Sequence, residues 1–347
     1  MTDDIRLRAI DDTRDDPARE AHTALEATMF EVKRVIVGQE AMLERLLVAL
    51  LAGGHVLLEG VPGLAKTLTV KTLADALGGE FKRLQFTPDL VPADLVGTRI
   101  YRADTGDFDT ELGPVFCNFL LADEINRAPA KVQSALLEVM QERQVTIGHE
   151  THAVPRPFLV LATQNPIESE GTYPLPEAQV DRFLMKVVVD YPTPTEEATV
   201  VERVIGVPAE VEQRLMMEKL LDFREAVRQI YVDREVVDHA VELADATRRP
   251  ERYELPELET LIDYGSSPRG PIGLIQSAQA LAMLRGRRYV LPGDVTDLAL
   301  DVLRHRIVLS YEALSDGVEV DQLLEQVLEA VPEPGIEAGP PEEALAA

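Results

Sequence analysis

The sequence has one cysteine, no tryptophan and only 5% aromatic residues. Cys117 therefore lacks a partner for an internal disulfide bond, and the histidines do not combine with it into a cluster with zinc-ligand spacing. Because disulfide-bonded proteins belong to oxidising compartments, this composition fits a reducing one. Cys117 lies in an apolar segment, so we expect it to be a small core residue.

Positive charge and long apolar runs are also scarce. Lysine and arginine number 34 against 61 aspartate and glutamate residues, which gives a formal net charge of −27. A field of that sign repels phosphate backbones, so the composition disfavours a nucleic-acid partner. Gly53, Gly54 and His55 interrupt the longest apolar stretch, and the first twenty residues lack the apolar core of a signal peptide. We therefore expect no transmembrane segment and a cytoplasmic protein.

The 347 residues are 46% apolar, which is enough for two or three domains with real cores. Over the first half of the chain, short apolar segments alternate with segments of helical periodicity. This alternation predicts an α/β fold with an open parallel sheet flanked by helices. The predicted strands are His55–Glu59, Phe81–Phe86, Phe119–Ala122, Phe158–Ala162 and Phe183–Val189.

From Thr195 the pattern changes to helical periodicity without strand-like runs, and Pro192 and Pro194 mark the change. We therefore predict a smaller, all-helical domain after the α/β core. The predicted divisions are a charged N-terminal arm (1–22), the core (23–192), the helical domain (195–330) and a disordered tail (331–347).

Residues 60–67 have the spacing of a phosphate-binding loop, G-x-x-x-x-G-K-[ST], with Ala65 in place of the second glycine. The loop joins a predicted strand to a predicted helix, so its backbone N–H groups are placed to surround a phosphate. Lys66 is placed to reach the β and γ oxygens of ATP, and Thr67 to bind Mg²⁺. The alternative is a glycine-rich turn with an exposed lysine. The predicted nucleotide-binding residues here are Gly60, Val61, Pro62, Gly63, Leu64, Ala65, Lys66, Thr67 and Leu68.

Two adjacent carboxylates, Asp123 and Glu124, end the predicted strand at Phe119–Ala122. Successive side chains at a strand end point in different directions. Asp123 is therefore a candidate to hold Mg²⁺, together with Thr67, while Glu124 polarises an attacking water. The alternative is a solvated acidic strand end in an acidic protein.

Asn165 follows the predicted strand at Phe158–Ala162. A neutral amide there is suited to hydrogen-bond both a lytic water and a γ-phosphate oxygen. Asn165 precedes a proline, so an ordinary turn is the alternative.

Taken together, these segments resemble the MoxR family of AAA+ ATPases. The phosphate loop occurs in many families, but ADEINRAP (122–129) and QFTPDLVPADLVG (85–97) are specific to this one. The resemblance covers about residues 25–310 and implies an AAA+ core followed by a helical lid. Family members commonly have alanine at the position of Ala65. The other matching stretches are IVGQ (36–39), GVPGLAKT (60–67), GPVFCNFLLADEINRAPAKVQSALLEVMQE (113–142), ATQNP (162–166), PLPEAQVDRF (174–183) and GSSPRG (265–270).

The resemblance also implies roles for residues that spacing alone does not single out. Arg182 matches an arginine finger that is supplied to the ATP of the neighbouring subunit, and an intramolecular salt bridge is its alternative. Arg269 matches a second-sensor arginine that reaches from the lid to the γ-phosphate, and an ordinary loop arginine is its alternative. Gly38 and Gln39 fall where the family has its adenine-side loop.

By family analogy, the chain forms a homo-oligomeric ring, a hexamer, that uses ATP and Mg²⁺ to remodel a protein client, activate it or insert a cofactor into it. A partner with a von Willebrand factor A domain is implied as well. The alternatives are a chelatase-type motor for metal insertion and an ATP-gated scaffold with little turnover. A DNA-remodelling ATPase is disfavoured by the net charge.

Three further features have simpler interpretations. The insert at residues 87–113 is long for an α/β connection, and with a hairpin at Val145–Val154 we expect it to contact a client or partner. His149 and His152 are too few for a metal site. The arginines at 285, 287 and 288 fit a solvated helix end beside acidic neighbours better than an anion site.

Overall fold

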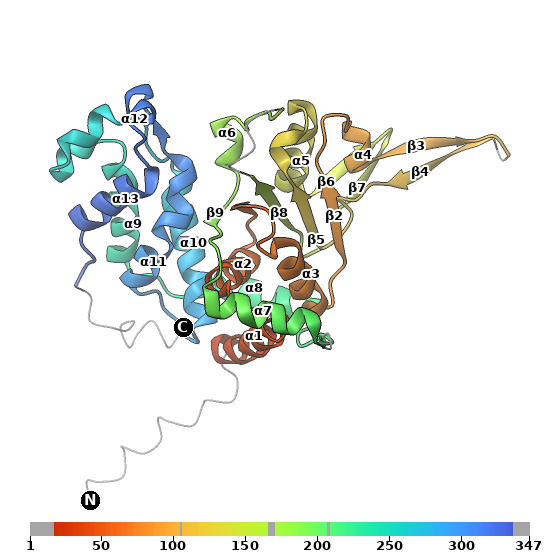
Figure 1. Ribbon diagram of the computed structural model, residues 1–347, viewed down its shortest axis with the longest axis horizontal. Coiled ribbons are helices and arrows are strands. Elements are labelled where there is room, and N and C mark those ends of the chain that lie inside the picture. The colour runs from red at the N-terminus through yellow and green to blue at the C-terminus, as the bar shows by residue number, and fades with distance from the viewer. Residues whose placement is uncertain (1–16, 105, 166–170, 207–208, 336–347) are drawn as a thin grey trace, which may run out of the picture.

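The computed structural model describes residues 17–104, 106–165, 171–206 and 209–335. Its centre is a parallel sheet with the strand order β2-β5-β8-β1-β9 (Figure 1). All four neighbouring pairs run parallel, which confirms the predicted α/β fold. The strands are β1 (Val56–Glu59), β2 (Phe81–Gln85), β5 (Phe119–Asp123), β8 (Leu159–Gln164) and β9 (Met185–Val188).

The sheet separates two apolar cores because successive side chains of a strand point to opposite faces. Leu121 of β5 and Leu161 of β8 belong to one core, whereas Leu120 and Val160 belong to the other. These central strands are buried on both faces, which explains their continuous apolar sequences.

Helices cover both faces of the sheet. The first core includes residues of α1 (Pro17–Lys33), α2 (Glu40–Ala52), α3 (Lys66–Leu77) and α8 (Met217–Val227). The second core is covered by α5 (Ala130–Glu142) and by α4 (Pro92–Val96), and it contains the buried Cys117, as predicted. The short elements of this half are the 3₁₀ turn η1 (Ile125–Arg127) and α6 (Glu177–Val180).

The chain start differs from the prediction. Helix α1 begins at Pro17, so residues 17–22, which we assigned to the charged arm, are helical. Ala18, Ala21 and Leu25 are buried, and the burial of this apolar stripe stabilises the helix. The remainder of the predicted arm and most of the predicted tail lie outside the described residues.

The second half is mostly helical, and much of it lies on the far side of the helix at residues 269–284 from the sheet (Figure 1). It also contains a two-stranded antiparallel ribbon, β10–β11, which the sequence did not predict because each strand is only two or three residues long. Its elements are α9 (Arg234–Ala246), η2 (Pro250–Tyr253), η3 (Pro256–Thr260), β10 (Ile262–Tyr264), α10 (Arg269–Leu284), α11 (Pro292–Leu303), η4 (Arg304–Arg306), β11 (Val308–Leu309), α12 (Tyr311–Ser315) and α13 (Val320–Ala330).

Two helices after Thr195 pack on the α/β core. Helix α8 contacts α1 and α2. Arg203 of α7 (Pro194–Ile205) donates to the carbonyl oxygens of Lys33 and Arg34, both at 2.8 Å. Sequence periodicity identifies these helices but does not say which part of the molecule they cover.

The insert at 87–113 contains α4 and a hairpin of β3 (Gly97–Arg102) and β4 (Asp107–Leu112). In Figure 1 this hairpin extends away from the sheet. A second hairpin, β6 (Gln144–Ile147) with β7 (Glu150–Ala153), confirms the hairpin predicted at 145–154. Strand β3 contacts β6, so the two hairpins lie together.

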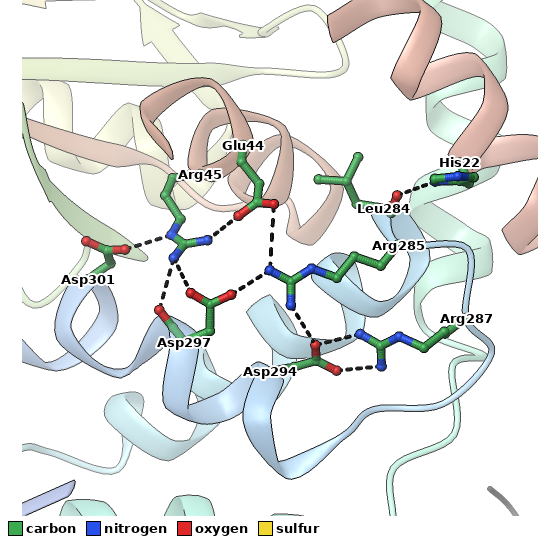
Figure 2. Close-up of polar contacts among 9 residues, drawn as sticks. All are labelled: His22, Glu44, Arg45, Leu284, Arg285, Arg287, Asp294, Asp297 and Asp301. Carbon is green, nitrogen blue, oxygen red and sulfur yellow. Dashed lines mark hydrogen bonds and ion pairs between the residues drawn. The ribbon is translucent and has the colours of Figure 1, made fainter. Parts of the chain in front are cut away.

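Ion pairs join the core to the helical half (Figure 2). Arg45 of α2 donates from Nε to Asp301 Oδ2 at 2.7 Å and from Nη2 to Asp297 Oδ1 at 2.8 Å. Burial by itself lowers the pKa of Arg45, but the hydrogen bonds and charges of these two carboxylates raise it overall. Helix α11 is thereby tied to α2.

The predicted basic patch after α10 belongs to the same network. Arg287 donates two hydrogen bonds to Asp294, at 2.6 and 2.7 Å, and Arg285 pairs with Asp294 and Asp297 (Figure 2). Acidic neighbours therefore neutralise this patch, in agreement with the plain interpretation.

The Arg45→Met variant tests this junction. We expect it to lower the free energy of unfolding by about 2–3 kcal/mol, because two carboxylates lose a charged hydrogen-bond partner. Urea unfolding followed by circular dichroism measures the loss. The control is Arg234→Met, which breaks the exposed pair with Asp238 and should cost less than about 1 kcal/mol. Equal losses in both variants would contradict a stabilising role for the junction.

Candidate functional site

A cleft of about 380 Å³ lies at the carboxyl edge of the sheet, where β1, β5 and β8 end side by side. It contains most of the residues that the sequence predicted for nucleotide binding and hydrolysis. Val61 is the one residue of the predicted loop that does not line it; instead it packs against the first core. The residues that line the cleft are Gly60, Pro62, Gly63, Leu64, Ala65, Lys66, Thr67, Leu68, Arg83, Asp123, Glu124, Thr163, Gln164 and Asn165.

The phosphate loop connects β1 to α3, as predicted, and α3 begins at Lys66. Lys66 Nζ donates to the carbonyl oxygen of Gly60 at 2.6 Å, so the lysine folds back over its own loop. Burial lowers the pKa of Lys66, although Asp123 and Glu124 act in the opposite direction. The ammonium group is therefore held next to the space that the loop encloses.

Ala65 adopts a left-handed backbone conformation, with φ of 54° and ψ of 15°. This is the conformation that favours glycine, which explains why the loop pattern has glycine at this position. Alanine there costs on the order of 1 kcal/mol relative to an unstrained residue. The surrounding strand and helix hold the loop in shape despite this strain.

Asp123 and Glu124 diverge, as the sequence analysis expected. Asp123 Oδ1 accepts a hydrogen bond from Thr163 Oγ1 at 2.6 Å, and Asp123 Oδ2 accepts one from Arg83 Nη2 at 2.6 Å. Glu124 has a left-handed backbone, with φ of 55°, which turns its side chain away from that of Asp123. Its Oε2 accepts from Gln85 Nε2 at 2.8 Å.

Four partners of these carboxylates escaped the sequence analysis: Arg83, Gln85, Arg127 and Thr163. Arg127 Nη1 lies 3.0 Å from Glu124 Oε2, and Thr163 Oγ1 also accepts a hydrogen bond from the backbone N–H of Glu124 at 2.8 Å. The register that pairs Gln85 with Asp123 brings the β2 residues to the site. Sequence periodicity carries no signal for a register between strands so far apart in the chain.

Asn165 directly follows β8 and is buried, with 7% of its surface exposed. It lines the same cleft as Lys66, Asp123 and Glu124. The position therefore agrees with the predicted one.

The predicted Mg²⁺ ligands, Thr67 and Asp123, both line the cleft. One hydroxyl and one carboxylate suit a Mg²⁺ ion that takes its other oxygens from nucleotide phosphates and water. In the part of the chain that the structure describes, no group of three or more histidine, cysteine, aspartate or glutamate side chains is placed to hold a metal by itself.

Gly38 and Gln39 lie outside this cleft. Both have left-handed backbones, with φ of 68° and 57°, and they precede α2. Gln39 Nε2 donates to the carbonyl oxygen of Asp190 at 2.9 Å, which holds the loop against the segment that follows β9.

Arg182 and Arg269 lie apart from the phosphate loop. They line a different groove, of about 220 Å³, together with Gly54 and His55. His55 precedes β1, whereas the phosphate loop follows it, so this groove lies toward the opposite edge of the sheet. The expectation that Arg269 reaches the nucleotide of its own subunit therefore does not agree with its position here.

The ion pair suggested for Arg182 is absent among the described residues. Asp181 instead pairs with Arg306 at 3.0 Å and with Arg269 at 3.4 Å. Arg182 is exposed at the start of the segment that leads into β9. Its guanidinium thus remains available to a group outside the subunit.

Comparisons with known proteins agree with this geometry. Residues 55–185 match the model of the ATPase family associated with various cellular activities (AAA), and residues 257–327 match the AAA lid domain. The chain is 55% identical to Chaperone MoxR1 of Mycobacterium tuberculosis, over 93% of this chain and 85% of that protein. It is 34% identical to Protein MoxR of Paracoccus denitrificans, over 86% of this chain and 93% of that protein.

A crystal structure of a protein from Cytophaga hutchinsonii superposes with a TM-score of 0.86 and 47% identity. The match covers 91% of this chain and 96% of that one. The chain therefore belongs to the MoxR family of AAA+ ATPases. None of the helices within the described ranges is long and apolar enough to cross a membrane.

The Lys66→Ala variant tests the phosphate site. We expect it to weaken ATP binding by at least about 10–100-fold, because the loop loses its one charged hydrogen-bond donor to phosphate. Calorimetric titration with ATP and Mg²⁺ measures the change. Lys71→Ala is the matched control, since Lys71 is exposed on the same helix. Unchanged micromolar affinity in Lys66→Ala would place the phosphate site elsewhere.

Proposed function

We propose that this protein is a Mg²⁺-dependent ATPase that hydrolyses ATP between the subunits of a cytoplasmic ring and uses the cycle to act on a protein client. One observation carries the proposal: the phosphate loop, two divergent carboxylates and a buried amide share one cleft, while two arginines lie in a different groove. Each subunit would thus supply the nucleotide-binding part of one ATPase site from its cleft and the arginines of a neighbouring site from its groove.

Within the cleft, each residue has a distinct task. The backbone N–H groups of the loop and Lys66 bind the phosphates, and Thr67 and Asp123 hold the Mg²⁺ that neutralises them. Glu124 polarises the attacking water, and Asn165 orients that water against the γ-phosphate. The hydrogen bonds from Gln85 and Arg127 hold the Glu124 carboxylate in its orientation within the cleft.

Arg182 and Arg269 serve the neighbouring subunit. Since both line the same groove, away from the cleft of their own chain, a head-to-tail interface would present them together to the next ATP. An arginine finger contributes about 10³–10⁵ in rate, which corresponds to roughly 4–7 kcal/mol of barrier. Assembly into a ring, a hexamer by family analogy, would therefore switch hydrolysis on. Gly38 and Gln39 form the adenine-side loop.

The client-contacting surface is the β3–β4 hairpin. Its exposed aromatic residues, Tyr101 and Phe108, are in contact with tilted rings whose centroids lie 5.3 Å apart, and Arg99 lies over Phe108 at 4.9 Å. Exposed aromatic and arginine side chains are common in protein-binding surfaces. The work on the client is remodelling, activation or cofactor insertion, with a von Willebrand factor A domain protein as a plausible partner class.

The Glu124→Gln variant separates binding from hydrolysis. We expect ATP turnover to fall by about 10²–10⁴, because the water loses its general base, while ATP affinity stays within a few-fold. Phosphate release and ATP titration measure the two quantities. A wild-type protein that binds ATP without steady turnover would favour the scaffold alternative instead.

The same variant identifies the client. Held in the ATP state, Glu124→Gln should capture from its native cell a protein that Lys66→Ala does not capture. A metalloenzyme that lacks its metal would favour the chelatase-type alternative. Equal capture by both variants would contradict an ATP-gated action on the client.

Mixed rings test the arginines. Arg182→Ala and Glu124→Gln subunits should each be inactive alone and regain part of the activity when mixed, because some interfaces then combine an intact cleft with an intact arginine. Arg269→Ala should behave in the same way. Steady-state ATPase assays measure the rescue, with exchange of labelled subunits as the control. Mixtures that exchange subunits but stay inactive would contradict action across the interface.

A further inference from the structure

Besides the ATP cleft and the groove that contains Arg182, the structure has a further pocket, of about 530 Å³, which is lined by four arginines. Arg143 follows α5 and Arg156 precedes β8. Arg224 belongs to α8, and Arg228 is the residue that directly follows this helix. Leu51 and Ala52 of α2 and Gln276 and Gln279 of α10 complete the lining together with Leu221, Asp222, Glu225 and Val227. The phosphate-loop cleft shares none of these residues.

These arginines are poorly paired for such an acidic protein. Among the described residues, Arg156 and Arg224 have no ion pair or hydrogen bond, and Arg143 donates only to the carbonyl oxygen of Gly53, at 2.9 Å. Only Arg228 has a carboxylate partner, Glu225, at 3.3 Å. The arginines in Figure 2, by contrast, are each matched by one or more aspartates or glutamates.

Two of these like charges are half-buried beside the other two. Arg143 and Arg224 are half-buried, and burial together with Arg143 and Arg228 lowers the pKa of Arg224 to about 10. Burial, Arg156 and Arg228 lower the pKa of Arg143. An anion in the pocket would offset both the desolvation and the repulsion.

We propose that this arginine pocket binds a phosphate-bearing small molecule, at a site separate from the ATP cleft. Guanidinium groups bind phosphate oxygens in a bidentate fashion, and several converging from different elements suit a ligand with two or more phosphates. The volume lies in the range of small-molecule sites. A small anion reaches the half-buried Arg143 and Arg224, whereas a flat protein surface would meet mainly the exposed Arg156 and Arg228.

The site also adjoins the groove that contains Arg182 and Arg269, because Gln276 lines both. Arg143 holds the carbonyl of Gly53, and the neighbouring Gly54 lines that groove. A bound anion would therefore lie next to the surface through which we propose that subunits cooperate. The binding site itself does not depend on that proposal.

Pyrophosphate is the probe, and the Lys66→Ala variant is the host, because its ATP cleft has lost its phosphate-binding lysine. Without Mg²⁺, calorimetric titration should show one pyrophosphate per chain. Adding Arg224→Gln should weaken the binding at least ten-fold, whereas adding Arg234→Gln, at an exposed ion pair at the start of α9, should not change it. No binding at millimolar pyrophosphate, or equal binding with and without Arg224→Gln, would overturn the proposal.

Arg156→Gln provides a second test at an exposed position that folding does not require. It should weaken pyrophosphate binding several-fold and raise the melting temperature of the free protein, because it removes one of four like charges. A purely structural role for Arg156 predicts a lower melting temperature and unchanged binding, and that result would count against the proposal.

Two further arms identify the source of the phosphate. Tighter binding of Mg²⁺-free ATP than of pyrophosphate to Lys66→Ala would indicate a nucleotide ligand, and the reverse order would indicate a free polyphosphate. Both orders support the site if Arg224→Gln weakens the binding. If the arginine variants instead alter only ring assembly, measured by light scattering, the pocket is a subunit interface and the proposal is wrong.

Discussion

The parallel pairing of β1, β5 and β8 is the constraint on which the candidate site depends. Lys66, Asp123 and Asn165 are far apart in the chain, yet each lies at the carboxyl end of one of these strands. Asp123 is the last residue of β5, Asn165 directly follows β8, and Lys66 follows β1 across the phosphate loop. The hydrogen-bonded ladders fix the three ends at one edge, and the apolar cores on both faces of the sheet hold the ladders in place. If this register changed, the residues of the cleft would no longer lie together, even though every side chain was still present.

The arginines of this acidic protein differ in the partners that surround them, and three of them illustrate the range. Arg45 is satisfied by carboxylates and joins the core to α11, which makes it a structural group. Arg83 pairs with Asp123, which leaves that carboxylate oriented within the cleft. Arg224 has no ion pair among the described residues, and it lines the pocket for which we propose an anion. An arginine's partners, rather than its presence, therefore indicate its role.

The separation of the cleft from Arg182 and Arg269 has a direct consequence for a member of the MoxR family. Asp181 is held by Arg306 and Arg269, which anchors the segment that carries Arg182 to the helical half. With Arg45 tying α2 to α11, two independent sets of ion pairs connect the halves of one chain. In the ring that we propose, a nucleotide-driven change would therefore be better accommodated between subunits than within one.

The sequence by itself determined the α/β class and the positions of the five strands of the central sheet to within a few residues. It also predicted one site for the phosphate loop, Asp123, Glu124 and Asn165, and these residues line one cleft apart from Val61. These features are local, because periodicity, loop spacing and residue type depend on near neighbours. Only the tertiary structure decided that Arg83 reaches Asp123, that Arg269 lies away from the phosphate loop, and that four arginines share a pocket. Those outcomes depend on strand register and helix packing, which arise from contacts between segments distant in the chain.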